Sequence, residues 1–242
     1  MSNPVFNEKF VSNERVLNSE PMTINGAINK TYLLLALLIA TSLIVWDLFL
    51  KGFSDKVAML GFVGFIGSII SFIVIMFNRK AISIAAPAYA ASEGLVIGAI
   101  SSVIEKSYPG IVIHAVGLTF LCLAVMLGLY RIGAIKCSER FRSIIFIATF
   151  SIAGIYIIDL IGSFFGMHIP QIFTSSSIGI GFSLIVVTIA ALNLIIDFDF
   201  IEQGATRMLD KNYEWYGAFG LIVTLVWLYI EILNLLAKLR ER

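Results

Sequence analysis

Seven long apolar stretches constrain this chain more than any other feature. They cover roughly residues 32–50, 57–77, 86–104, 111–132, 143–166, 175–199 and 215–237. Each is long enough to cross a hydrocarbon core about 30 Å thick as a helix. A helix satisfies its backbone hydrogen bonds within one segment, as lipid requires, and the stretches lack the alternation of a membrane β-barrel. The sequence therefore predicts an all-α integral membrane protein, a seven-transmembrane-helix bundle.

The low content of charged residues supports a membrane protein, and the distribution of charge separates an N-terminal tail from the rest of the chain. Of the 242 residues, 14% are charged, whereas a soluble domain carries about a quarter. The net charge of +1 gives no strong field that would attract nucleic acid. Residues 1–31 are polar and mixed in charge, without the apolar core and cleavage site of a signal peptide. We expect residues 1–31 to form a cytosolic N-terminal tail and residues 32–242 to form the transmembrane domain.

The basic residues indicate an orientation. Eleven of the 17 Lys and Arg residues lie in the tail and the even-numbered loops, and six lie on the opposite side. Lys and Arg are enriched in cytoplasmic loops. The count predicts a cytoplasmic N-terminus, a C-terminus outside, and a cytosolic Cys137 in the fourth loop.

Glycines recur at helical spacing in the second and third stretches. Gly61, Gly64 and Gly67 are three residues apart, and Gly94 and Gly98 are four apart. Small residues at such spacing let helix backbones approach closely. The alternative is that membrane helices are simply rich in glycine.

Acidic residues inside apolar stretches are functional candidates, because a charge in hydrocarbon needs a partner or water. Asn193 and Asp197 are four residues apart and share one face of the sixth stretch. Glu93 and Asp159 lie in the third and fifth stretches, where they either join a continuous polar path or act as structural hydrogen-bonding groups. Asp199 lies nearly opposite Asp197, so we expect it to meet headgroups or to cap the helix end.

The last stretch carries a polar stripe. Its members follow a 3-4-3 spacing and are Thr224, Trp227, Glu231 and Asn234. Such a stripe on an apolar helix should face the bundle interior or a wet cavity.

Catalytic signatures are missing from the sequence. It contains no His-Glu-x-x-His, no Gly-x-Ser-x-Gly and no Walker loop. His114 and His168 each stand alone, so no firm metal site and no cofactor is predicted. We do not expect an enzyme.

Three segments carry a family resemblance. They are Glu93–Ile100 with Tyr108-Pro109-Gly110, then Ile195-Ile196-Asp197-Phe198, and finally the run from Leu221 to Leu233. In order and spacing they resemble the Bax inhibitor family, also called the transmembrane Bax-inhibitor-motif or YccA-like family, over about residues 25–239. The segments at residues 2–6 and 22–26 resemble its bacterial branch, which implies a multi-pass protein of the inner cell membrane.

The resemblance implies a bundle around a central C-terminal helix and a pH-sensitive calcium leak governed by two aspartates in the last two helices. Asp197 matches the first aspartate, but Thr224 stands at the place of the second. A turn near residue 210 would place residue 223 level with Asp197. Glu231 lies two turns further along, about 10 Å away, and replaces the missing acid only if the helices shift.

Two functions from different classes remain open. The first is a cation leak channel or transporter, with calcium as the ion, since hard cations take oxygen ligands. Asp197 would contact the ion, and Asn193, Thr224 and Glu231 would supply further oxygens and sense pH. Burial disfavours the charged form of a carboxylate, so protonation of Asp197 would change the helix packing. The second is a non-conducting regulatory membrane protein that binds a membrane protease or another membrane partner.

Overall fold

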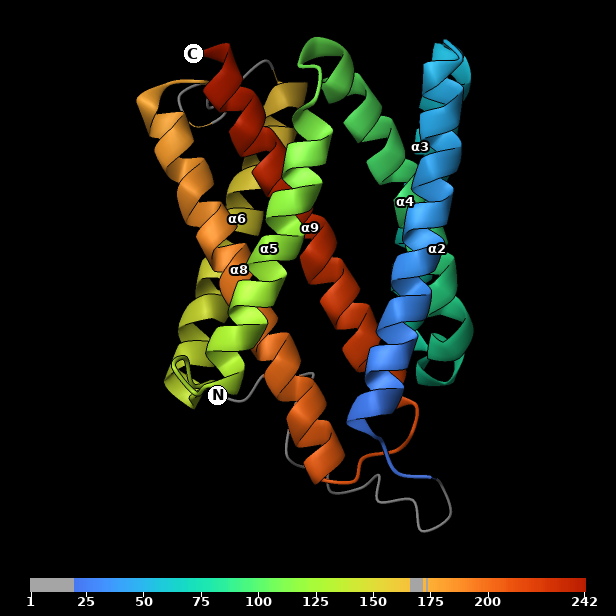
Figure 1. Cartoon of the computed structure of the whole chain (residues 1–242), viewed down its shortest axis with the longest axis vertical. Helices are drawn as coiled ribbons and strands as arrows, with labels where there is room; N and C mark the ends of the chain where they lie inside the picture. The colour runs from blue at the N-terminus through green and yellow to red at the C-terminus, as the bar shows by residue number, and fades with distance from the viewer. Residues whose placement is uncertain (1–19, 166–171, 173) are drawn as a thin grey trace. The chain divides into compact units, whose positions relative to one another are not determined.

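The computed structural model describes residues 20–165, 172 and 174–242, and these contain seven long helices (Figure 1). The helices are α2 (Ile24–Leu50), α3 (Ser54–Phe77), α4 (Ile82–Ser107), α5 (Ile111–Arg131), α6 (Glu139–Phe164), α8 (Ser177–Thr206) and α9 (Tyr213–Glu241), with a 3-10 turn η1 (Arg79–Ala81) before α4. All seven are long and apolar enough to cross a membrane. The prediction of an all-α, multi-pass membrane bundle is confirmed.

The first helix begins eight residues before the first apolar stretch. The Thr23 side chain caps α2 by accepting a hydrogen bond of 2.9 Å from the Gly26 N–H, which satisfies one of the unpaired donors of the first turn. Polar residues therefore form the first turns of α2. Residues 1–19 of the predicted tail lie outside the described residues, so the tail itself stays a prediction.

The sixth span also runs further than expected, to Thr206 instead of residue 199. It ends in a Schellman arrangement. Met208 has a positive φ of 51°, its N–H bonds to the Ala205 carbonyl, and the Leu209 N–H bonds to the Gly204 carbonyl, both at 3.1 Å. Residues 207–212 then lead directly into α9.

The chain divides into two compact units, residues 1–100 with 197–222, and residues 101–196 with 223–242. Helices α4, α8 and α9 contribute to both. In the first unit, α3 packs against α4 through its glycines. A Cβ added at Gly61 would lie 2.7 Å from the Ala99 Cβ, and one at Gly64 would lie 2.8 Å from the Leu95 Cβ. The predicted close contacts of α3 are confirmed.

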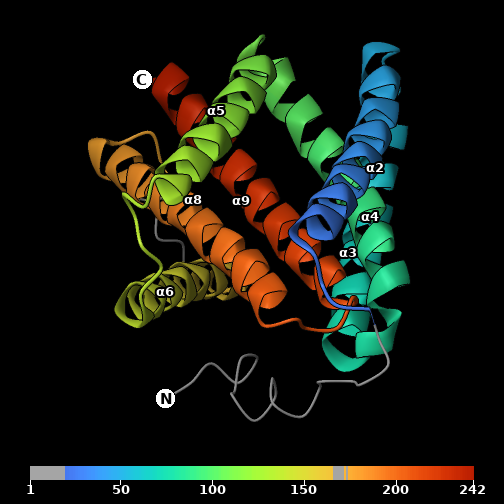
Figure 2. The same cartoon turned by 60° about the horizontal axis from the view of Figure 1, so that its bottom comes forward.

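The glycines of α4 face α2 in the same unit, and Figure 2 shows α2, α3 and α4 side by side. A Cβ at Gly98 would lie 2.8 Å from the Val45 Cβ and 2.9 Å from the Ser42 carbonyl oxygen. One at Gly94 would overlap the Leu38 carbonyl. Helix α4 therefore packs closely against α2 through its own glycines, and against α3 through the glycines of α3.

The second unit contains α5, α6, the first part of α8 and the last part of α9. The Glu105 carboxylate accepts hydrogen bonds from the Gly110 and Val112 N–H groups, at 2.6 and 3.1 Å, and so caps α5. Gly110 has a φ of +82°, which a residue without a Cβ adopts readily. Arg240 of α9 donates to the Pro109 carbonyl at 2.7 Å, which ties this turn to the end of α9.

Burial distinguishes α9 from the other helices. Within its most apolar window 67% of the residues are buried, against 39% or less for the other six spans. This agrees with a bundle built around the last helix.

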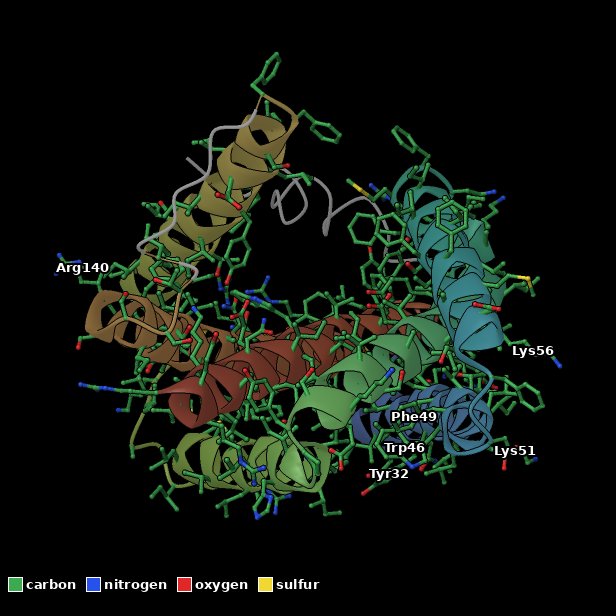
Figure 3. The ribbon with its side chains drawn as sticks, turned by 90° about the horizontal axis from the view of Figure 1, so that it is seen from above. Tyr32, Trp46, Phe49, Lys51, Lys56 and Arg140 are labelled. Atoms are coloured by element: carbon green, nitrogen blue, oxygen red, sulfur yellow. The ribbon has the colours of Figure 1, made fainter. Side chains whose placement is uncertain are left out.

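Large apolar side chains on the outer helices face outward. Examples are Met59, Phe62 and Phe77 on α3, and Ile147, Phe150 and Phe164 on α6. Figure 3 shows Tyr32 of α2 and Lys56 of α3 extending away from their helices. Large apolar side chains exposed in this way suit a lipid environment.

Candidate functional site

Asp197 lies where α8 meets α9 in the first unit. Its Oδ1 atom is 3.4 Å from the position that a Cβ would take at Gly220 of α9. One turn away, a Cβ at Gly217 would lie 2.7 Å from the Ile201 Cγ1 atom. Both glycines let the two backbones approach, so the half-buried Asp197 carboxylate rests against the α9 main chain. The last part of α8 therefore lies beside the first part of α9.

The α9 residue beside Asp197 differs from the one expected. Gly220 takes this place, three residues before position 223 and one turn before Thr224. Asp197 and Gly220 are equally far along the chain from the Met208–Leu209 bond, so their pairing is centred before residue 210. Thr224 itself is buried and belongs to the second unit.

Asp199 does not face headgroups, and this expectation was wrong. The residue is 9% exposed, and the Gln203 amide donates to its Oδ2 atom at 2.6 Å. The physical reason is again the length of α8. With the helix continuing to Thr206, Asp199 lies about two turns inside its end.

Asn193 connects two helices of the second unit. Its side-chain amide donates to the Thr149 hydroxyl of α6 and to the Ile189 carbonyl of α8, both at 2.9 Å. The amide therefore has a structural hydrogen-bonding role here, one turn before Asp197 on the same helix.

Glu231 is the most enclosed acid of the second unit, at 3% exposure. Its Oε1 atom accepts hydrogen bonds from the Tyr156 hydroxyl at 2.8 Å and from the Trp227 indole N–H at 3.1 Å. The predicted inward stripe of α9 is thus buried at Thr224 and Glu231. The donors to the Glu231 carboxylate are neutral side chains, one from α6 and one from α9.

Lys238 lies two turns further along α9. Its ammonium group donates to the Ile172 and Gly179 carbonyls at 3.0 and 3.3 Å, and to the Ser183 hydroxyl at 2.9 Å. All three acceptors are neutral oxygens. Lys238 was counted only as a loop charge in the sequence, and its role in joining α9 to α8 had no sequence signal.

The two remaining candidates lie in different units. Glu93 of α4 belongs to the first, where the Ser68 side chain of α3 hydrogen-bonds to it. Asp159 is a partly exposed residue of α6 in the second. The structure therefore assigns Glu93 to the unit of Asp197, and Asp159 to the unit of Asn193, Thr224 and Glu231.

One buried acid, Glu214 of α9, was not predicted. It is 1% exposed and lies in the first unit against the start of α2. Its Oε1 atom accepts hydrogen bonds from both the backbone N–H and the hydroxyl of Thr23, each at 2.9 Å, while its Oε2 atom forms an ion pair with Lys30. The Lys30 ammonium also lies 5.3 Å from the centroid of the Trp215 ring. We call Thr23, Lys30 and Glu214 the clasp.

The segment before α2 reinforces the clasp. Pro21 forms an antiparallel bridge with Asp210, and the Met22 N–H donates to the Leu209 carbonyl at 2.7 Å. Lys211 pairs with Glu20 at the surface, and the hydrogen bond that its ammonium group donates to Glu20 raises the pKa of Lys211. Hydropathy could not reveal this site, because its two halves are 191 residues apart.

No metal centre is formed by the described part of the chain, in which no three His, Cys, Asp or Glu residues gather. His114 bonds to the Gly110 carbonyl at 2.6 Å. His168 lies outside the described residues.

Seven spans, an acid against the α8–α9 contact and further buried acids define an integral membrane protein of the helical-bundle class. A family model described as Bax inhibitor 1 like matches residues 3–241, nearly the whole chain. The chain therefore belongs to this family. No curated protein matches it.

Proposed function

We propose that this protein is a pH-sensitive cation leak channel or transporter of the inner cell membrane, with calcium as the ion and Asp197 as the gate. One observation carries the proposal: the Asp197 carboxylate lies against the α9 backbone at Gly220, where α9 has no side chain. Protonation of Asp197 would change the charge at this contact, and with it the hydrogen-bond or cation partners that the carboxylate needs.

The two charge states of a carboxylate make opposite demands. The charged form needs a cation, water or hydrogen-bond donors, whereas the neutral form can itself donate a hydrogen bond. Packed helices respond to such a change by shifting between discrete arrangements. We therefore expect proton binding at Asp197 to change how α8 packs against α9, and so to make opening depend on pH.

The oxygen chemistry is that of a hard cation. Calcium takes oxygen ligands from carboxylates, amides and hydroxyls. Asp197 is the proposed contact of the ion. No reaction is proposed, because the function requires only passage of the ion.

Purified protein in liposomes tests the proposal. We expect calcium influx in wild type to differ between about pH 6 and pH 8, because the proposal requires Asp197 to change its charge in this range. Asp197→Asn should conduct without this pH dependence. Asp199→Asn is the matched control, two residues away and bonded to Gln203, and should keep the dependence.

Two outcomes contradict the proposal separately. If Asp197→Asn keeps the wild-type pH profile, Asp197 is not the gate. If wild-type liposomes pass no calcium at either pH, the protein is not a leak, and the second proposal replaces it. That proposal is a non-conducting membrane regulator that binds a membrane protease or another membrane partner.

A further inference from the structure

The clasp brings three polar contacts to one carboxylate. Glu214 accepts two hydrogen bonds from Thr23 and pairs with Lys30, and it is almost fully buried. A buried charge persists only where its partners are held in place. The start of α2 and the first turn of α9 are therefore fixed to one another.

Close packing against Gly26 further restricts where the Glu214 carboxylate can lie. A Cβ added at Gly26 would overlap it, so the carboxylate fills the space that the missing side chain leaves on α2. The Trp215 ring centroid lies 5.3 Å from the Lys30 ammonium. Neither the depth of α9 nor its rotation about its own axis can change without breaking these contacts.

This constraint extends along α9 to Asp197. Glu214, Gly217 and Gly220 are spaced three residues apart and so form one of the ridges of a helix surface. Gly217 packs on Ile201, and Gly220 packs on Asp197. A rotation of α9 at Glu214 therefore moves the surface that Asp197 touches.

Other charged residues lie on the helices of the first unit. They are Lys30 and Asp47 of α2, Asp55 and Lys56 of α3, Glu93 of α4, Asp199 and Glu202 of α8, and Glu214 of α9.

We propose that Glu214 is a positioning residue for Asp197: with Thr23 and Lys30 it sets the rotation and depth of α9, and thereby the contact of Gly220 with the Asp197 carboxylate. The inference rests on the proposed gating role of Asp197. It adds that the start of the first span controls how this gate responds to protons.

The experiment follows the protonation of Asp197 without relying on ion flux. Dicyclohexylcarbodiimide modifies protonated carboxyl groups in apolar surroundings. Its reaction with Asp197 is measured by peptide mass spectrometry on the full chain in lipid nanodiscs, from about pH 5 to pH 9. The variants are Lys30→Met, Glu214→Gln and Gly26→Ala. The last keeps both charges and displaces the carboxylate by steric overlap alone.

We expect the midpoint of Asp197 labelling to move by about half a pH unit or more in all three variants. Lys30→Arg keeps the charge and should restore the wild-type midpoint. Lys51→Met is the matched control, because it removes an exposed ion pair with Asp47 at the opposite end of α2. Its midpoint should not move. Liposome flux on the same variants should show shifts of the same sign.

The outcomes separate the two proposals. If Asp197 titrates in wild type and the midpoint stays unchanged in the clasp variants, Glu214 is a structural residue only and the inference is wrong. If wild-type Asp197 is not labelled at any pH, it is no titrating gate, and both proposals fall. Thr23→Val, which loses one hydrogen bond to Glu214, provides a milder variant if the charge variants do not fold, and an unmoved midpoint in it counts against the inference.

Discussion

Three buried carboxylates of the described chain are held in three different ways. Glu214 has a lysine and the two donors of Thr23, Asp199 has the Gln203 amide, and Glu231 has a tyrosine and a tryptophan. An acid with neutral donors depends on each of them, because a buried group that loses its partner retains the full desolvation cost. We therefore expect the loss of stability on removing a partner to differ among the three acids.

Tyr156→Phe tests this dependence at Glu231. The change keeps the ring and removes the hydroxyl that donates to Glu231, so we expect a loss of stability of about 1–3 kcal/mol. Thermal unfolding of the purified protein in detergent measures it. Tyr32→Phe is the control, since Tyr32 is 66% exposed. Equal unfolding midpoints for the two variants would contradict the role assigned to Tyr156.

At the scale of the helices, close backbone approach decides which glycines matter. Gly94 of α4 faces the Leu38 carbonyl of α2, which cannot move without moving the helix, whereas Gly117 of α5 has nothing within 4 Å of an added Cβ. The same residue type thus serves packing in one helix and merely occupies the surface in the other.

Substitution by alanine separates the two cases. Gly94→Ala should destabilise the protein by about 1–3 kcal/mol, because α2 and α4 must separate. Gly117→Ala should be neutral or stabilise by up to about 1 kcal/mol through helix propensity. Thermal unfolding of both variants in one detergent gives the comparison. A Gly94→Ala protein as stable as Gly117→Ala would mean that α4 can shift without cost.

Helix ends were the least predictable part of the elements. Hydropathy marks where a helix leaves the hydrocarbon, but the helix itself continues until its backbone is capped. Thr23 starts α2 before the first apolar stretch, and the left-handed Met208 follows the end of α8, past Glu202. The error at α8 is what made Asp199 look like a terminal residue.

At the scale of the whole molecule, the clasp constrains how often the chain crosses the membrane. It joins the start of α2 to the start of α9, so both starts lie on one side of the membrane. The helices from α2 to α8 therefore make an even number of crossings. Six candidate spans in this interval satisfy the condition.

Thiol labelling tests which side this is. The excess of Lys and Arg predicts a cytosolic N-terminus and a cytosolic Cys137 between α5 and α6. A membrane-impermeant maleimide added to whole cells should leave Cys137 unlabelled, and permeabilisation should make it reactive. A Cys122→Ser background ensures that the signal comes from Cys137. Labelling of intact cells would reverse the proposed orientation.

The spans, the glycine contacts of α3 and α4, and the position of Asp197 beside α9 were predictable because they follow from local patterns of apolar, small and acidic residues. The clasp was not, because nothing near Lys30 in the sequence indicates Glu214. Hydropathy assigns both residues to a membrane interface, where charges are ordinary. Only the fold reveals that Glu214 is buried.

The separation of 191 residues between the two sides of the clasp also orders the biosynthesis of the protein. A chain is made from its N-terminus, and its early parts can pack before the later ones exist. While α2 to α8 are being inserted, the Glu214 carboxylate that pairs with Lys30 and packs on Gly26 has not yet been made. Helix α2 can therefore reach its final position only after α9 has been synthesised. Newly inserted chains that stop short of α9 should remain recognisable to membrane quality control by this exposed lysine.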